Sequence, residues 1–263
     1  MKILVCVKVV LDPEAPASLF KVDAEAKKVI PPKGTPPVLN PFDENALEAA
    51  LKLKEKQAGS TITVISLGKS IPRPVIKKSL ATGADSLVLL EDDTFEDLDS
   101  SGTANALVKA IRKIGQFDVI LCGREAADTD AGQVGLGIAE ILGLPSVSLA
   151  GKIEMADKNL KVDRVTPTGW ETIEVPLPAV ITVSSEVGNL RTASIQGIMA
   201  AQKKPMTIWT PKDLGIDQPQ TKKAKLFKLF QPTRDTKCEI IGGDTPEEAA
   251  EKLATRLREV KAI

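Results

Sequence analysis

Residues 117–147 read FDVILCGREAADTDAGQVGLGIAEILGLPSV, and this stretch decides the fold class. An apolar run over 117–123 ends in Cys-Gly, a short segment with two aspartates follows, and a glycine-rich sequence opens a helix predicted over 132–142. A strand that is apolar without alternation is buried on both faces, and strands that alternate with helices are typical of βαβ units. The stretch therefore predicts a parallel sheet with helices on both faces.

The same alternation runs through the N-terminal half of the chain. With four such units, a common strand order is 3-2-1-4, which reverses between the first and the fourth strand. We therefore predict an α/β fold, a doubly wound and mostly parallel sheet of the Rossmann-like, adenine-nucleotide-binding kind. Ligands bind such sheets at the carboxyl ends of the strands beside the reversal, where the opening stretch lies. Strands are expected at 2–9, 60–68 and 86–90, and helices at 43–56, 74–83 and 102–114.

The pattern changes after residue 145. Three strand-like segments, 145–155, 159–166 and 172–183, are separated by short polar turns and predict antiparallel additions to the sheet or a hairpin at its edge. The following residues, up to 210, show little pattern. A smaller hairpin is expected from FKVD and KKVI, within a long loop over 12–37.

The C-terminal residues 206–263 are expected to form an arm. Their last segment, TPEEAAEKLATRLREV, predicts a helix that begins with a capping box formed by Thr245 and Glu248. The region before this helix is too polar to build a core of its own. We therefore expect the arm to pack on another subunit, beside a nucleotide-binding domain over 1–205. The alternative is a terminus packed on the surface of a monomer.

Composition excludes several classes of function. The 263 residues include no histidine and no tyrosine, and 35 basic residues balance 35 acidic ones. A histidine triad, an imidazole base and a histidine metal ligand are therefore excluded, and bulk charge favours neither nucleic acid nor an acidic membrane. The three cysteines, Cys6, Cys122 and Cys238, are far apart, which makes a metal site improbable and fits a reducing, cytoplasmic setting. Redox chemistry would need an organic cofactor.

No targeting or membrane segment is expected either. The longest apolar runs are shorter than the roughly 20 residues of a membrane span. The start, MKILVCVKVV, reads as a strand and not as a signal peptide, because no small-residue cleavage site follows a long apolar region.

The loop after the fourth strand has the chemistry of a nucleotide site. Gly132, Gly135 and Gly137 allow close backbone approach, and free N–H groups at the start of the helix suit a phosphate. Asp128 and Asp130 would repel a phosphate, so we expect them to bind a ribose or an amide or to cap the helix. The alternative is a well-capped helix with small residues for packing. Neither a GxGxxG after the first strand nor a P-loop is present.

A second candidate region is VLNPFDENALEAA, residues 38–50. Asn40-Pro41 is a turn signal directly before a helix, and Asn40 is expected either to cap that helix or to hydrogen-bond an adenine edge. Leu67, at the end of the second strand, is expected to pack on a base face or to be an ordinary strand terminus.

Six motifs together resemble the β subunit of electron-transfer flavoprotein, over nearly the whole chain. They are MKILVCVKVV, LNPFDENALEAALKLKE, LATGADSLVLL, CGREAADTDAGQVG, LPAVITV and IMAAQKKPMTIWTPKDLGID. The resemblance implies an electron carrier that breaks no bonds itself, paired with an α subunit that holds most of the redox FAD. It also implies electron transfer from an acyl-CoA dehydrogenase-type donor to a quinone-linked oxidoreductase or a similar acceptor. A stand-alone ATP-binding protein of the stress type is the competing class, but KVVLDPEAPAS offers no phosphate-gripping loop.

The resemblance also implies a nucleotide in this subunit, which is AMP in many members and a second FAD in electron-bifurcating members. Ala131 and Leu136 stand where second-FAD members have threonine and proline, which favours AMP. The CGRE lead-in, the Q-V-G continuation and the space at Gly132 favour the second FAD. The implied nucleotide contacts are Cys6, Asn40, Pro41, Phe42, Asp43, Leu67, Asp128, Thr129, Asp130, Ala131, Gly132, Gln133, Val134, Gly135, Leu136, Gly137, Ile138 and Ala139.

The partner-recognition loop of the family matches residues 190–199, LRTASIQGIM. The implied contact residues are Leu190, Arg191, Ile195 and Met199, with Ile195 in the anchoring position where many relatives have leucine. The lysine cluster after the loop is thin here, AAQKKP, which weakens the expected electrostatic contribution.

Overall fold

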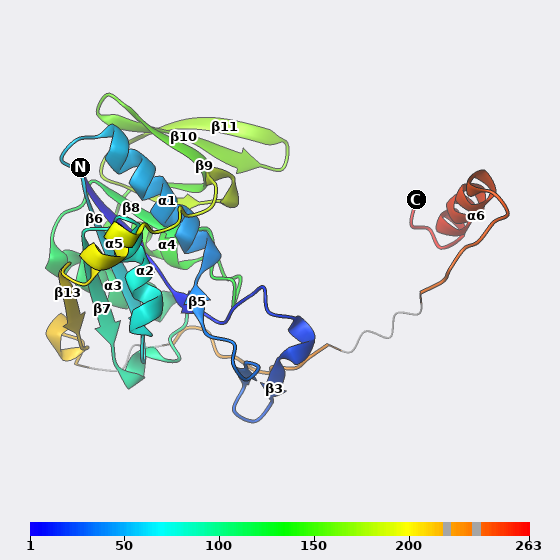
Figure 1. Ribbon diagram of the computed structural model, residues 1–263, viewed down its shortest axis with the longest axis horizontal. Coiled ribbons are helices and arrows are strands. Elements are labelled where there is room, and N and C mark those ends of the chain that lie inside the picture. Colours follow the sequence, from blue (N-terminus) through cyan, green and yellow to red (C-terminus); the bar gives the residue numbers. More distant parts are fainter. Residues whose placement is uncertain (218–221, 233–237) are drawn as a thin grey trace. The chain divides into compact units, whose positions relative to one another are not determined.

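The computed structural model describes residues 1–217, 222–232 and 238–263, and Figure 1 shows its helices and strands. The chain divides into two compact units, Met1–Lys228 and Leu229–Ile263. The first unit contains the sheet and all the expected site residues. The second contains the helix α6, Pro246–Glu259.

Within the described residues, the first unit is built on a nine-stranded sheet in the order β11-β10-β9-β12-β8-β1-β6-β7-β13. The four strands that the opening argument needs are mutually parallel and adjacent, in the order β7-β6-β1-β8. This is the expected 3-2-1-4 order, so the prediction of a doubly wound sheet is confirmed. The reversal lies between β1 and β8. The four strands are β1 Lys2–Cys6, β6 Thr61–Gly68, β7 Ser86–Glu91 and β8 Val119–Gly123.

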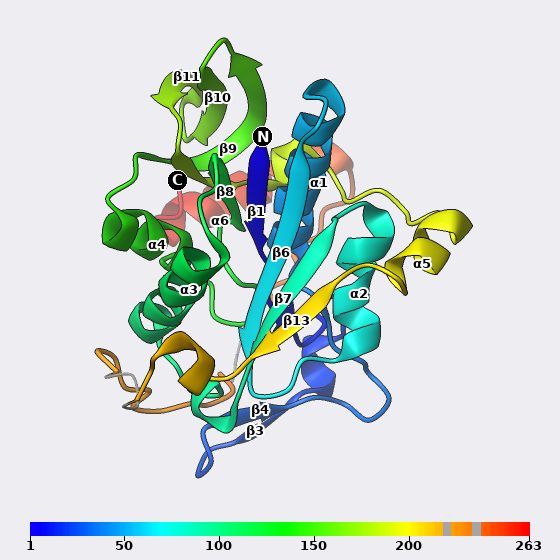
Figure 2. The same ribbon diagram turned by 90° about the vertical axis from the view of Figure 1, so that its left-hand side faces the viewer.

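Two helices cover each face of the sheet (Figure 2). Alternate strand residues point to opposite faces, so Ile3 and Val5 pack under α1 and α2 while Leu4 and Cys6 pack under α3 and α4. The apolar stripe of α1 is buried: Ala46, Leu47, Ala50, Leu51 and Leu53. The four helices are α1 Pro41–Lys56, α2 Arg73–Thr82, α3 Ser100–Ile114 and α4 Val134–Leu142.

The expected strand over 2–9 is two strands. β1 ends at Cys6, and β2, Val9–Val10, pairs with β5, Val38–Leu39, in a separate ladder. The break falls at Lys8, whose N–H donates to the side chain of Asp43 at 2.7 Å instead of to a neighbouring strand. The small hairpin is confirmed as β3, Lys21–Asp23, and β4, Lys28–Ile30.

Both edges of the sheet are extended by the second half of the chain. Three strands form an antiparallel meander, as expected: β9 Ser146–Ala156, β10 Asn159–Thr166 and β11 Gly169–Pro176. The expected single run over 172–183 is divided, because the prolines at 176 and 178 cannot donate to a ladder and β12, Ala179–Val183, instead enters the sheet parallel to β8 and β9.

The residues with little sequence pattern also contain regular structure. A short helix, α5, covers Ile195–Ala201, and β13, Met206–Trp209, adds a parallel edge strand beside β7. The compact unit Met1–Lys228 includes β13, and the expected arm over 206–263 with its packing on another subunit stays a prediction. Within the described residues, the unit also has four single 3-10 turns: η1 Ala17–Leu19, η2 Asp93–Phe95, η3 Ser185–Val187 and η4 Lys212–Leu214.

Helix α6 of the second unit begins as its sequence predicts. The hydroxyl of Thr245 accepts the N–H of Glu248 at 3.2 Å, and the Glu248 carboxylate accepts the N–H of Asp244 at 2.8 Å. The capping box therefore closes one residue earlier than its usual form. Throughout the described parts of the chain, each helix is too short or too polar to cross a membrane.

Candidate functional site

The carboxylate of Asp43 joins three elements at the carboxyl edge of the sheet. Asp43 is buried in the first turn of α1, where one oxygen accepts the N–H of Lys8 at 2.7 Å and the other accepts the N–H of Gly123 at 3.0 Å. Burial raises the pKa of Asp43 to about 7, against the opposing effect of hydrogen bonds from Lys8, Asn40 and Gly123. The start of α1 and the ends of β1 and β8 are therefore held together by one side chain.

Gly123 must be glycine for this contact. A Cβ at this position would lie 2.5 Å from Oδ1 of Asp43 and 2.6 Å from the carbonyl carbon of Phe42. Both distances are shorter than any real carbon contact, so α1 can approach the end of β8 only because Gly123 has no side chain.

Asn40 shapes the loop that follows β8. Its side chain is fully buried, donates to the carbonyl of Glu125 at 2.8 Å and accepts the N–H of Ala127 at 3.1 Å. It makes no capping hydrogen bond to α1. The expected capping of α1 by the Asn40 side chain is therefore wrong, and its adenine contact stays a prediction.

Asp128 points toward β1. Its carboxylate forms an ion pair with the ammonium of Lys8 at 2.7 Å, on a partly exposed surface. Thr129 and Asp130 both donate their N–H groups to the carbonyl of Ala126, which closes a turn, and Asp130 has a left-handed backbone with φ of 48°. Neither aspartate caps α4.

Helix α4 consequently begins without a side-chain cap in the part of the chain that the structure describes. The first backbone bond of the helix runs from Gly137 to the carbonyl of Gln133, so the N–H groups of the preceding turn have no partner within the helix. The helix follows directly from the loop at the sheet reversal. Its free N–H groups and the positive end of its dipole therefore form an anion-binding feature at this edge.

Two of the three loop glycines serve packing. A Cβ on Gly135 would lie 2.8 Å from Cγ2 of Thr182, and one on Gly137 would lie 3.1 Å from Cβ of Ala104. Gly132 differs, because its φ of 61° is a left-handed turn that lets the loop enter the helix. The alternative interpretation, a well-capped helix with small residues for packing, is therefore correct about the packing of Gly135 and Gly137 and wrong about the cap.

The floor of the edge is apolar and contains two thiols. Cys6 and Cys122 are buried at the ends of β1 and β8. A hydrogen bond with Cys6, burial and the nearby charge of Asp43 raise the pKa of Cys122 well above its ordinary value, so this thiol stays protonated. Leu67, half-buried at the end of β6, packs against the same face. Its neighbour Ser66 has a buried hydroxyl with no hydrogen-bond partner among the described residues.

Two cations of this edge were not predicted from the sequence. Lys8 follows β1, and Arg124 follows β8, where its guanidinium lies 4.4 Å from the ring centroid of Phe42 and pairs with Glu125 at 2.9 Å. Their position directly after parallel strands was the available signal, since strand ends meet at one edge. Ser66 had a similar signal, as a polar residue inside an apolar strand.

The remaining residues expected to contact the nucleotide differ in how far they are buried. Ala131 and Gln133 are exposed, Leu136 is 42% exposed, and Pro41 and Val134 are half-buried. The side chains of Ile138 and Ala139 lie in the core beneath α4, so only their backbone could serve a ligand.

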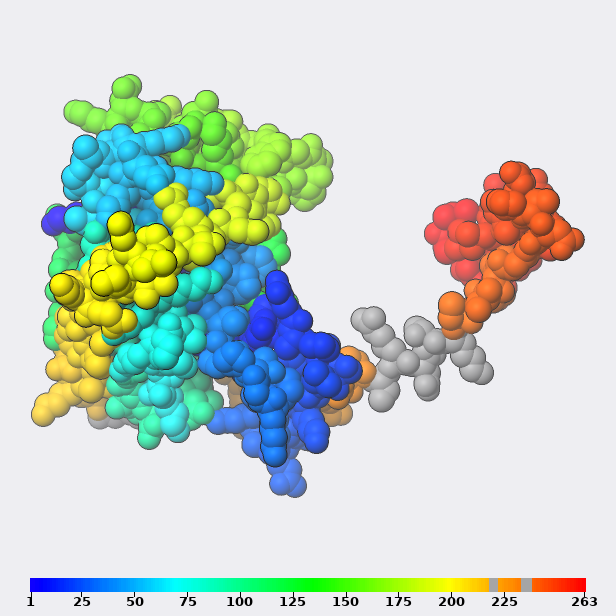
Figure 3. Space-filling view, in the orientation of Figure 1, coloured from blue at the N-terminus to red at the C-terminus, as the bar shows by residue number. Residues whose placement is uncertain are grey.

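The expected partner-recognition residues lie on or near α5. One face of α5 is exposed and apolar, because Ile195, Ile198 and Met199 follow one another at i, i+3 and i+4 and are 78%, 51% and 69% exposed. We call this face the ridge, and Figure 3 shows α5 in yellow on the surface. Leu190 instead packs against the core, and the guanidinium of Arg191 is held by the carboxylates of Glu48 and Glu55. The structure therefore exposes two of the four expected residues and uses the other two internally.

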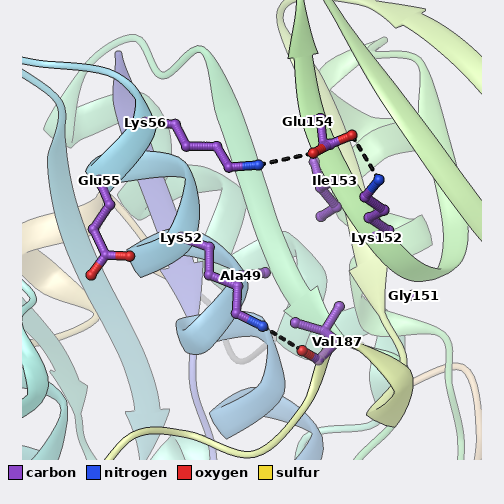
Figure 4. Close-up of a pocket in the computed structure, with 9 residues that line it drawn as sticks. All are labelled: Ala49, Lys52, Glu55, Lys56, Gly151, Lys152, Ile153, Glu154 and Val187. Carbon is purple, nitrogen blue, oxygen red and sulfur yellow. Dashed lines mark hydrogen bonds and ion pairs between the residues drawn. The ribbon is translucent and has the colours of Figure 1, made fainter.

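A hollow of about 250 Å³ lies between α1 and β9 (Figure 4). Its charged side chains already have partners: Lys56 and Lys152 each contact Glu154 at 2.9 Å, and Glu55 contacts Arg191. It is lined by Ala49, Lys52, Glu55, Lys56, Gly151, Lys152, Ile153, Glu154 and Val187. Within the described residues, no cluster of three or more Cys, Asp or Glu is arranged to hold a metal ion.

Comparison with known proteins identifies similar chains. Residues 29–214 match the family described as "Electron transfer flavoprotein domain". The chain is 36% identical to "Caffeyl-CoA reductase-Etf complex subunit CarD" of Acetobacterium woodii, with all of both chains covered. It is 38% and 35% identical to "Electron transfer flavoprotein subunit beta" of Thermoanaerobacterium thermosaccharolyticum and of Clostridium acetobutylicum, with 98% of each chain covered in both cases.

Proposed function

The chain belongs to the electron transfer flavoprotein family, and we propose that it is the β subunit of an electron-carrying heterodimer and not an enzyme in its own right. A flavin held mainly by the α subunit would supply the redox chemistry. The residues of this chain would bind an adenine nucleotide and present a docking surface. The lack of histidine and tyrosine suits that role, because electron transfer needs no acid or base from this subunit.

The observation that carries the nucleotide assignment is the uncapped start of α4 at the reversal of the sheet. Free N–H groups of the helix would hold a phosphate, and the cations of Lys8 and Arg124 would neutralise it. Leu67, at the end of β6, offers an apolar surface for the base. These features fit an adenylate group, and we propose AMP as the ligand.

A second FAD is the alternative, with its ADP part in the same place. It is favoured by the 36% identity to a subunit of a caffeyl-CoA reductase-Etf complex, which covers the whole chain. In this form the heterodimer would be electron-bifurcating and linked to NADH. The left-handed turn at Gly132 would leave room for the longer ligand.

The proposed redox partners are an acyl-CoA dehydrogenase-type donor and a quinone-linked oxidoreductase or similar acceptor. The exposed ridge of Ile195, Ile198 and Met199 supports docking, because an apolar cluster on a polar surface is typical of a brief protein contact.

The test is co-purification with the α subunit, followed by flavin absorbance and nucleotide analysis of the released ligands. One flavin and one AMP per heterodimer would support the first assignment, and two flavins without AMP would establish the second. A heterodimer that releases no nucleotide beyond one FAD, or a chain that purifies with no α partner, would refute the proposal.

A matched pair of variants locates the nucleotide. Lys8→Gln removes the cation at the strand end but keeps the backbone N–H that Asp43 needs. We expect it to lower nucleotide retention about tenfold, as the loss of one charge-assisted contact predicts. Lys161→Gln, on the exposed side of β10, should leave nucleotide retention unchanged.

A further inference from the structure

One row of side chains on α1 holds the segment that leads to the exposed ridge. Asn45, Glu48, Lys52 and Glu55 follow one another at helical spacing and share a face of the helix. The amide of Asn45 donates to the carbonyl of Gly188 at 2.7 Å. The ammonium of Lys52 donates to the carbonyl of Val187 at 2.6 Å, as Figure 4 shows. Asn45 and Lys52 therefore both contact the segment that begins at residue 187.

Arg191, in the segment after residue 187, is bound by the two carboxylates of the row. Glu48 accepts its Nε at 3.0 Å, its Nη2 at 2.9 Å and its backbone N–H at 3.1 Å, while Glu55 accepts its Nη1. Glu48 is only 5% exposed. Burial alone would raise the pKa of Glu48, but the hydrogen bonds from Arg191 lower it below its ordinary value, so the pair is ionised. A lysine lacks the planar fork that makes this bidentate contact.

The other end of the ridge is fixed to α2. A Cβ on Gly197 would lie 2.3 Å from the carbonyl oxygen of Ala81, so α5 touches the backbone of α2. The ammonium of Lys204 donates to the carbonyls of Leu80 and Ala84, at the end of α2, at 2.8 Å and 2.6 Å. The ridge is thus attached at both ends, and its apolar side chains point outward.

A helix of seven residues cannot hold its conformation by itself, so the attachments decide the shape of the ridge. A buried ion pair adds little net stability over apolar packing, and its better-attested role is to fix one geometry. The Glu48 carboxylate is buried and the Arg191 side chain is 35% exposed, so their contact is a partly buried ion pair. It lies at the start of the segment that leads to the ridge, where it would fix the geometry.

We propose that Glu48 and Arg191 are positioning residues, which hold the ridge in the conformation that presents Ile195 and Met199 to the redox partner. The proposal rests on the proposed docking role of that ridge. The family resemblance implied that Arg191 contacts the partner; in this proposal it acts by holding the segment before α5.

The test uses the heterodimer with Arg191→Met and Arg191→Lys, and Lys203→Met as the control that removes an exposed positive charge just after α5. Amide hydrogen exchange over 187–201 is measured without any donor present. We expect Arg191→Met to raise it about tenfold or more, Arg191→Lys to raise it less, and Lys203→Met to leave it unchanged. Exchange in β12 should not change. Unaltered exchange in Arg191→Met would overturn the positioning role.

Electron uptake from an acyl-CoA dehydrogenase then separates the two proposals. Arg191→Met should raise KM for the carrier about tenfold at an unchanged limiting rate, with unchanged nucleotide content. Ile195→Ala should raise KM without altering exchange. If Ile195→Ala raises KM and Arg191→Met does not, the positioning role of Arg191 is refuted, while the docking role of the ridge is supported. If neither variant changes KM, the docking role fails and the positioning proposal fails with it.

Discussion

Replacement of Asp43 by asparagine tests how the nucleotide edge is built. Asparagine has the size of aspartate, but its NH₂ nitrogen cannot accept a hydrogen bond, whereas both carboxyl oxygens of aspartate can, including the hydroxyl oxygen of the protonated form. The N–H groups of Lys8 and Gly123 each bond to a different oxygen, so one of them would face a donor in the variant. An unsatisfied buried N–H costs about 1–3 kcal/mol of unfolding free energy. The loss should be largest at low pH.

The pH dependence follows from the raised pKa of Asp43. The pKa of this carboxyl is about 7 in the folded protein and 3.8, its ordinary value, in the unfolded chain. Between these two pH values the folded state therefore retains a proton that the unfolded state releases. Stability of the natural protein should therefore fall as pH rises, by up to about 1.4 kcal/mol per pH unit from this group. The asparagine side chain of the variant would not titrate. The stability gap between the natural protein and Asp43→Asn should shrink from pH 4.5 to pH 7.

The assay is urea unfolding of both proteins at pH 4.5, 5.5, 6.5 and 7.5, with matched nucleotide content, because the other titrating groups cancel in the difference. Asp118→Asn is the control, since the Asp118 carboxylate also accepts an N–H, from Lys2, but at a solvent-accessible position. Its effect should stay below about 1 kcal/mol. A gap for Asp43→Asn that stays constant or widens as pH rises would show that the pKa of Asp43 is not raised in the folded protein, and would refute the reasoning.

Two further substitutions test the site and the ridge. Gly123→Ala should displace α1 from the end of β8, because its Cβ would overlap the Asp43 carboxylate and the Phe42 backbone. We expect a loss of about 1–3 kcal/mol in urea unfolding and a lower nucleotide content, and full retention of both would contradict the contact. Ser194→Ala removes the hydroxyl that accepts the N–H of Gly197 at the start of α5. It should raise hydrogen exchange in α5 by a few-fold to about tenfold, as the loss of an N-cap predicts, with unchanged exchange in α1; equal exchange in both proteins would contradict it.

The order of the four central strands could be predicted from the sequence, because it depends on patterns within short segments. Unalternating apolar strands, helices of ordinary spacing and short connections restrict the topology to few choices, and the 3-2-1-4 order is one of them. The same reasoning missed β13, whose four residues, MTIW, carry no periodicity and form a strand only because β7 offers a free edge. It also joined β11 to β12, since apolar residues continue on both sides of the prolines that separate them.

The site was predictable in position but not in its contacts. Topology brings the loop after β8 to the sheet reversal, and local sequence suffices for that step. Which partner each polar side chain takes depends on distances between elements far apart in the chain. Asn40 binds the backbone at 125 and 127, and Asp128 binds Lys8, across 85 to 120 residues of sequence. No local rule could distinguish these contacts from the capping roles that the same residue types usually have.

Helix α1 has different tasks at its two ends, and this explains its unusual composition. Its first turn provides Asp43 to the nucleotide edge, while the row from Asn45 to Glu55 faces the segment before the docking ridge. A surface helix needs polar residues only for solubility, yet Asp43, Asn45 and Glu48 are all buried. Burial of polar groups is costly unless each is hydrogen-bonded, so their presence is best explained by the contacts they make. The helix thus sets the distance between the proposed nucleotide and the docking surface, and substitutions on either face should be read in both assays.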